Sequence, residues 1–173
     1  MLTIRHVCVL TACIAFVTAC ESSTDTQSQV TYTAQLKGTN EVPPNQTTGT
    51  GFFVGTLNPR DSTLSYSVTW TGLTARATIA HIHGPADAST NAGILVDFAA
   101  PPPGTTNGTS SNLGSGTLTS GSASGNLNLK LTITATVSGD SLLKLFDAGR
   151  VYANVHTPAN GGGEIRGQIT RQQ

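Results

Sequence analysis

The chain has 173 residues, of which 37% are hydrophobic and 10% are charged, with nine Lys and Arg against nine Asp and Glu. This length predicts one domain with an ordinary hydrophobic core. We expect no binding to nucleic acid, because the charged residues form no basic cluster that could neutralise phosphates.

The N-terminal segment, residues 1–19, has the pattern of an export signal. Arg5 precedes an apolar run that is too short to span a bilayer and has the length of a signal-peptide core. The run ends in V-T-A-C, which resembles the bacterial lipobox and marks Cys20 as the acylated residue of a lipoprotein. An ordinary signal peptide cut near Ala19 is the alternative.

The segment after the signal predicts how the domain is attached. Residues 20–29 hold no apolar run and are expected to form a flexible tether to a membrane anchor of acyl chains such as palmitate at Cys20, with the domain at 30–173. Glu21 stands where an Asp would favour retention in the inner membrane, so the predicted location is the outer membrane or the cell surface. All three cysteines lie within residues 1–20, so we expect no disulfides in the domain.

From residue 30 onward, short runs rich in β-branched and aromatic residues are separated by Gly, Asn, Asp and Pro. In residues 64–70, apolar Leu, Tyr, Val and Trp alternate with Ser and Thr, as expected for a half-buried strand. The pattern predicts an all-β fold, a β-sandwich or barrel of about eight strands. The candidate strand ranges are 30–36, 51–57, 64–70, 78–83, 93–98, 114–119, 126–137, 150–156 and 163–170.

A helical period appears only in residues 140–149, which predicts one short connecting helix. Asp140 or Ser141 would cap it, Gly149 would end it, and Leu142 together with Leu145 or Phe146 would pack onto the sandwich. Two segments are predicted loops: residues 41–50, because prolines lack the amide hydrogens of a sheet ladder, and residues 99–112, which combine three prolines with a Gly/Ser/Thr run.

The histidines are the residues that point to chemistry. His81 and His83 are two positions apart on a predicted strand, so their side chains project from the same face. His156 lies on a strand whose opposite face is apolar, and these three are all the histidines outside the signal segment. If the two strands lie side by side, three imidazoles converge in an arrangement that suits copper or zinc and leaves one coordination position open.

The residues around His156 could support such a site. Asn154 shares the face of His156, while Glu164 and Arg166 share one face of the last strand and could orient the imidazoles from behind or pair with each other. An exposed ion pair between Glu164 and Arg166 is the alternative, and histidines that only hydrogen-bond to backbone carbonyls are the alternative to a metal site. The run of three glycines at 161–163 would allow a hairpin between the last two strands.

Three blocks carry a family resemblance: E-V-P-P at 41–44, A-H-I-H-G-P-A at 80–86, and V-Y-A-N-V-H-T-P-A-N-G-G-G-E-I-R-G-Q-I at 151–169. They resemble the signature blocks of the CHRD domain, a module named for chordin and found in microbial exported proteins. The resemblance spans about residues 30–171. It implies an all-β immunoglobulin-like sandwich or barrel, and it carries no implication of chordin's developmental role.

The H-I-H strand and the late N-G-G-G-E-I-R-G segment are also similar to the copper strand and glycine–arginine segment of copper–zinc superoxide dismutases. This similarity implies a Greek-key β-sandwich. That similarity would make the three histidines copper ligands and Arg166 an anion guide, although the chain has no fourth domain histidine and no disulfide pair. We therefore predict a binding module and not an enzyme. The alternatives are a metalloenzyme, dismutase-like or hydrolytic, with Glu164 or Asp97 as acid or base, and a surface adhesion module with an unidentified protein or matrix partner.

Overall fold

The computed structural model describes residues 28–99, 106–111, 118–130 and 139–173. The predicted signal peptide, the predicted acylation site and most of the tether lie outside these residues. The elements are β1 (Val30–Lys37), η1 (Gly38–Asn40), β2 (Thr50–Asn58), β3 (Thr63–Thr71), β4 (Ile79–His83), β5 (Ile94–Asp97), β6 (Thr106–Ser111), β7 (Gly121–Asn128), α1 (Gly139–Asp147), β8 (Val151–His156) and β9 (Ile165–Arg171).

The predicted all-β fold is confirmed. The nine strands form one antiparallel sheet in the order β5-β4-β8-β9-β1-β2-β3-β7-β6. In β3, Leu64, Tyr66, Val68 and Trp70 are buried, while the Ser and Thr residues between them face outward, as the alternation predicts.

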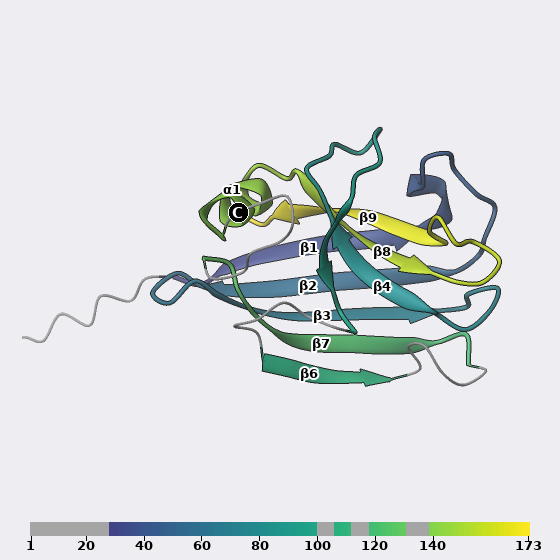
Figure 1. Ribbon diagram of the computed structural model, residues 1–173, viewed down its shortest axis with the longest axis horizontal. Helices are drawn as coiled ribbons and strands as arrows, with labels where there is room; N and C mark the ends of the chain where they lie inside the picture. Colours follow the sequence, from purple (N-terminus) through teal and green to yellow (C-terminus); the bar gives the residue numbers. More distant parts are fainter. Residues whose placement is uncertain (1–27, 100–105, 112–117, 131–138) are drawn as a thin grey trace, which may run out of the picture.

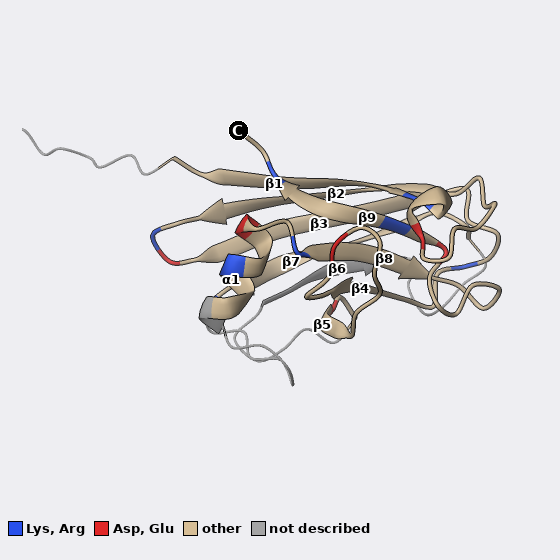
Figure 2. Ribbon diagram, turned by 90° about the horizontal axis from the view of Figure 1, so that it is seen from above, with Lys and Arg blue, Asp and Glu red and all other residues tan. Residues whose placement is uncertain are grey.

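The sheet curls over itself, so that β4 and β8 cross above β2 and β3 as in a sandwich or barrel (Figure 1). The ring of Phe98, just after β5, stacks on Tyr66 of β3 with 4.9 Å between ring centroids, which joins the two halves of the sheet. The inner faces of both halves share one hydrophobic core that includes Ile82 of β4 and Val155 of β8. In Figure 2, seen from above, the charged segments are few and scattered over the described residues.

The predicted helix is present and starts slightly earlier than expected, at Gly139. Leu142 and Phe146 are fully buried against the sheet, and Leu145 packs against the same core. Gly149 adopts a φ of 62° just past the helix, where its N–H donates to the Phe146 carbonyl. This left-handed position ends the helix and turns the chain into β8.

Three element predictions were wrong in part. The predicted loop 99–112 contains β6, because these Gly/Ser/Thr residues pair with β7 although they carry no apolar alternation. Of the predicted strand 114–119, the described residues 118–119 are not in a strand, and the strand in this region is β7, which pairs with β3 over its whole length. The predicted strand 126–137 ends at Asn128, and residues 131–137 lie outside the described residues.

Among the described residues, no helix is both long enough and apolar enough to cross a membrane.

Candidate metal centre

Pairing of β4 with β8 brings the three histidines together. The antiparallel register places Ile79 opposite His156, His81 opposite Asn154 and His83 opposite Tyr152. Since paired residues project from the same face of a sheet, all three imidazoles lie on one face. The intervening residues of β4 and β8 point the other way, into the core.

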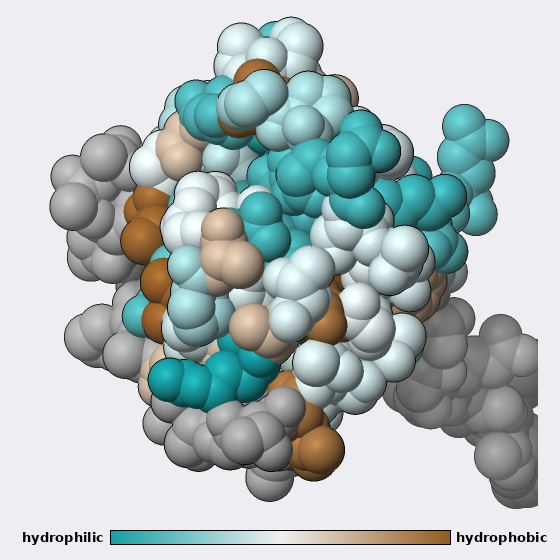
Figure 3. Space-filling view, turned by 90° about the vertical axis from the view of Figure 1, so that its right-hand side faces the viewer, coloured by the Kyte–Doolittle hydropathy of each residue, from teal (hydrophilic) through white to brown (hydrophobic). Residues whose placement is uncertain are grey.

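The three imidazoles are buried, with 2%, 8% and 5% of His81, His83 and His156 exposed. Loops on either side of these strands reach the rings, because His83 contacts Ala92 and His156 contacts Gly161. Hydrophilic and near-neutral residues form most of the face shown in Figure 3. The three imidazoles are therefore buried on the face of β4 and β8 that lies opposite the hydrophobic core.

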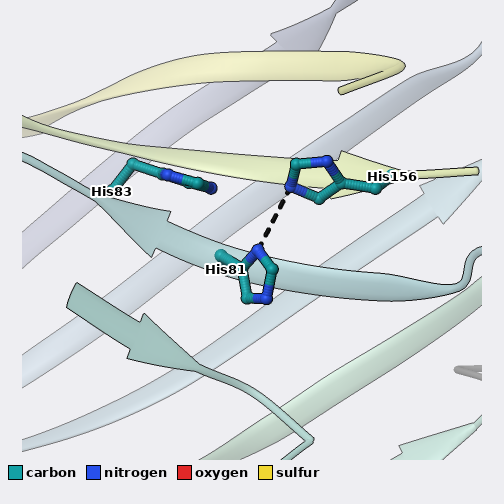
Figure 4. Close-up of side chains that lie close together, drawn as sticks. All are labelled: His81, His83 and His156. Carbon is teal, nitrogen blue, oxygen red and sulfur yellow. Dashed lines mark hydrogen bonds between the residues drawn. The ribbon is translucent and has the colours of Figure 1, made fainter. Parts of the chain in front are cut away.

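The three ring nitrogens lie close enough together that they could bind one metal ion. One nitrogen from each imidazole lies within 4.8 Å of the corresponding nitrogen of the other two. His81 Nδ1 and His156 Nε2 are 3.2 Å apart and face each other (Figure 4). Two nitrogens at this separation subtend roughly 100° at a metal about 2.0–2.1 Å from each, close to a tetrahedral angle.

Backbone carbonyls fix the protonation of two rings. The Nδ1–H of His83 donates to the Ala92 carbonyl at 3.0 Å, and the Nδ1–H of His156 donates to the Gly161 carbonyl at 3.1 Å. Because a carbonyl oxygen only accepts, the proton of each neutral ring is on Nδ1 and the lone pair is on Nε2. His83 Nε2 is buried and has no hydrogen-bond partner.

His81 lies between His156 and Asp97. Without a metal, His81 Nδ1 must donate to His156 Nε2, because that nitrogen carries a lone pair. The other nitrogen of His81, Nε2, is 3.9 Å from the Asp97 carboxylate. A proton moved to Nε2 would face this carboxylate and leave Nδ1 free to bind a metal.

Burial keeps the rings uncharged at neutral pH. It lowers the pKa of both His81 and His83 to about 4, and it also lowers the pKa of His156. For His81 the neighbouring His156 acts in the same direction. Neutral imidazole is the form that binds copper and zinc, so little proton release is needed before coordination.

Arg166 is buried beneath the loop that follows β4. Its Nη1 donates to the Asn91 side-chain oxygen at 3.0 Å, and its Nη2 donates to the carbonyls of Asp87 and Thr90, both at 2.9 Å. The guanidinium carbon lies 3.5 Å from the centroid of the Tyr152 ring. The role of anion guide, which the similarity to superoxide dismutases would imply, does not fit, because Arg166 is 1% exposed and its guanidinium already has these partners.

Glu164 is fully buried, so the alternative of an exposed Glu164–Arg166 ion pair was wrong. Its carboxylate accepts hydrogen bonds from the hydroxyls of Thr47, Thr74 and Thr157 and from the backbone N–H of Thr74, at 2.6–2.7 Å. Burial acts to raise the pKa of Glu164, but these hydrogen bonds together hold it below its ordinary value. Glu164 thus ties three loops to the start of β9 as a carboxylate.

Two important residues were not singled out from the sequence, Tyr152 and Glu41. The Tyr152 ring stacks on His83 with centroids 5.0 Å apart and planes 6° apart. Glu41 is buried next to Asn154, and burial raises its pKa to about 7, although the Arg166 charge and a hydrogen bond with Asn154 oppose the rise. In the sequence, Glu41 could have been noticed as a single charged residue in a proline-rich loop.

The structure explains why the predicted hairpin has a glycine at position 163. Its φ is 134°, and a Cβ there would lie 2.5 Å from the Asn154 amide and 2.7 Å from Glu41 Oε1. We expect Gly163→Ala to lower the free energy of unfolding by roughly 2–4 kcal/mol, from backbone strain and overpacking. Gly162→Ala is the matched control, since nothing lies within 4 Å of its Cβ position. Urea denaturation measures both, and equal stability of the two variants would contradict the expectation.

Comparison with protein-family models places the chain in a known family. The family model described as CHRD domain matches residues 32–169. This chain belongs to the CHRD domain family. The match begins in β1, ends in β9 and includes all three histidines. The comparisons with curated proteins and with solved structures gave no significant match.

Proposed function

We propose that this CHRD domain binds a transition metal, copper or zinc, through His81, His83 and His156. The observation that carries the proposal is the convergence of three buried ring nitrogens, one of which, His83 Nε2, has no hydrogen-bond partner. A buried polar atom without a partner costs roughly 1–3 kcal/mol, which a metal–nitrogen bond would offset.

Purely structural histidines fit the same contacts less well. In that role each ring nitrogen would be expected to meet a donor or an acceptor. Here the carbonyls of Ala92 and Gly161 hold the outer nitrogens and turn the inner nitrogens toward one another. Metal-binding histidines typically donate their other N–H in this way.

The ligand count supports a binding site that exchanges its metal or a fourth ligand. Three protein nitrogens leave one position open in tetrahedral coordination. Copper should outcompete zinc in such a site by the usual affinity order of divalent ions. We regard the domain as a binding module, because Glu164, one candidate acid or base for catalysis, is engaged by threonine donors.

Metal titration tests the proposal. We expect metal-free protein to bind about one equivalent of Cu(II) or Zn(II) at micromolar metal, because the set supplies three neutral nitrogens. Replacing His81, His83 and His156 by alanine should abolish binding and leave the far-ultraviolet circular dichroism of the metal-free protein unchanged. Gly162→Ala serves as a control that keeps all three ligands.

Two results would contradict the metal site. Binding of less than about a tenth of an equivalent by the wild-type protein would rule it out, since ligands this close together should saturate. Unfolding of the metal-free triple-alanine variant would instead favour histidines that only hold the fold together.

We further propose that the domain is exported and anchored to the outer membrane or cell surface through acyl chains on Cys20. The support is the signal pattern of residues 1–19 and the lipobox-like V-T-A-C. Labelled palmitate should be incorporated into the wild-type protein and not into Cys20→Ala. Incorporation into both proteins would contradict acylation at this cysteine.

A further inference from the structure

We propose that the three-histidine site selects monovalent Cu(I) over divalent ions, and that the buried positive charge of Arg166, placed behind His83 by Tyr152, sets this preference. The inference rests on the proposed metal site and names the ion that the site holds. It also assigns to Arg166 the role of a positioning and charge-setting residue.

Arg166, Tyr152 and His83 form a stacked column. Because β8 lies between β4 and β9, Tyr152 of β8 separates His83 of β4 from Arg166 of β9. The guanidinium carbon is 3.5 Å from the Tyr152 ring centroid, and on the other side the His83 ring is nearly parallel to it. The guanidinium is thus one aromatic ring away from a proposed metal ligand.

The same arginine holds the loop that orients His83. Arg166 donates to the carbonyls of Asp87 and Thr90 in this loop. A little further along, the Ala92 carbonyl accepts from His83 Nδ1–H, and the Ala92 N–H donates to the Tyr152 hydroxyl. Arg166 therefore fixes both the position of His83 and the charge behind it.

Charge decides which ion such a pocket accepts. The desolvation cost of an ion rises with the square of its charge, so a divalent ion pays about four times the cost of a monovalent one in the same pocket. The three ligands are neutral and return no compensating charge. The repulsion from the Arg166 guanidinium is also twice as large for a divalent ion.

Asp97 acts in the opposite direction and is the weaker influence. Its carboxylate is 3.9 Å from His81 Nε2, but 35% of its side chain is exposed, so water and salt screen it. Arg166 is 1% exposed and lies away from this screening, although the buried Glu41 carboxylate partly offsets its charge. Imidazole binds copper, and Cu(I) is the monovalent form of this metal, so the charge of the site favours Cu(I).

The test separates the effect of the Arg166 charge on metal affinity from the effect of the hydrogen bonds that Arg166 makes to the loop. At pH 8, Cu(I) affinity is measured anaerobically by competition with bicinchoninate, and Cu(II) and Zn(II) affinities are measured by competition with chelators of known affinity. We expect the wild-type protein to hold Cu(I) about 100-fold more tightly than Cu(II). Arg166→Gln should lower this ratio at least about tenfold, equivalent to 59 mV for a one-electron couple.

Arg166→Lys is the matched control, because it keeps the charge and loses the planar fork. It should retain the ratio within about threefold. If Arg166→Gln does not fold, as judged by circular dichroism, Glu41→Gln replaces it, because it removes the carboxylate that partly cancels the Arg166 charge at pH 8. That variant should raise the ratio.

The outcomes separate the two proposals. A ratio unchanged in Arg166→Gln, or lowered equally in the Gln and Lys variants, overturns charge selection. In the substitute test, a ratio that Glu41→Gln leaves unchanged or lowers overturns it as well. Tighter binding of Cu(II) or Zn(II) than of Cu(I) by the wild-type protein overturns the ion assignment and leaves the metal site standing. Failure to bind any of the three ions overturns the proposed function itself.

Discussion

Replacing Glu164 by alanine should lower the free energy of unfolding by roughly 3–5 kcal/mol, because the four hydrogen bonds that its buried carboxylate accepts would be lost together. The donors come from Thr47, Thr74 and Thr157, which lie in three loops that this carboxylate joins to the start of β9. The loss should appear as a lower urea midpoint with an unchanged slope, since the fold itself is retained.

Two further variants separate the charge from the contacts. Glu164→Gln preserves the shape but replaces one acceptor oxygen with an NH₂ group, so its loss should be substantial but smaller than that of alanine. Thr47→Val removes a single donor and should cost about 1–2 kcal/mol, because the carboxylate keeps its other partners. A stability of Glu164→Ala within about 1 kcal/mol of the wild type would contradict this view of the carboxylate.

Acidification should destabilise the metal-free domain well before ordinary carboxylates titrate. Burial lowers the pKa of His81 and His83 from 6.5 to about 4, so the unfolded chain binds more protons than the folded chain between these values. The stability is therefore complete above about pH 6.5 and is lost as the pH falls toward 4. Each proton contributes a slope of about 1.4 kcal/mol per pH unit.

Glu41 opposes this trend. Its pKa is raised from 4.5 to about 7, so in this range the folded chain binds a proton that the unfolded chain does not. It offsets about one of the histidine protons, and the lowered pKa of His156 adds in the histidine direction. The expected net slope is roughly 1–3 kcal/mol per pH unit.

Urea denaturation from pH 7 to pH 4.5 without metal measures this slope. Replacing the three histidines by alanine should remove the acid loss, and the remaining Glu41 effect should then make the domain more stable at lower pH, by about 1.4 kcal/mol per pH unit. Glu41→Gln should instead steepen the loss by about 1.4 kcal/mol per pH unit. An identical slope in the wild type and the triple-alanine variant would show that the histidines are not the groups that respond.

The strands that can be predicted are those with a local apolar alternation. In β3 and β8 every second residue is apolar, and this pattern alone places one face in the core. In β6 and β7 the residues are mostly Gly, Ser, Thr and Asn, so the local pattern favours a loop. These strands form because β3 offers β7 a free edge, which is a nonlocal interaction.

The identity of the three histidines could be read from the sequence, because His81 and His83 must share a face on any strand and the chain has so few other imidazoles. Their meeting with His156 depends on the register of β4 with β8, which no local pattern specifies. The roles of Glu164 and Arg166 were likewise open in the sequence. Their partners lie in loops far along the chain, so only the folded arrangement assigns them.

The sequence by itself determined the all-β class, the family, and the three histidines that suit a transition metal. The tertiary structure decided which nitrogens face inward, which carbonyls hold the outer nitrogens, and that an arginine and a tyrosine stand behind His83. The physical reason is that strand alternation is set by neighbours in the chain, whereas ring orientation, burial and charge at the site depend on contacts between segments as far apart as Glu41 and Arg166.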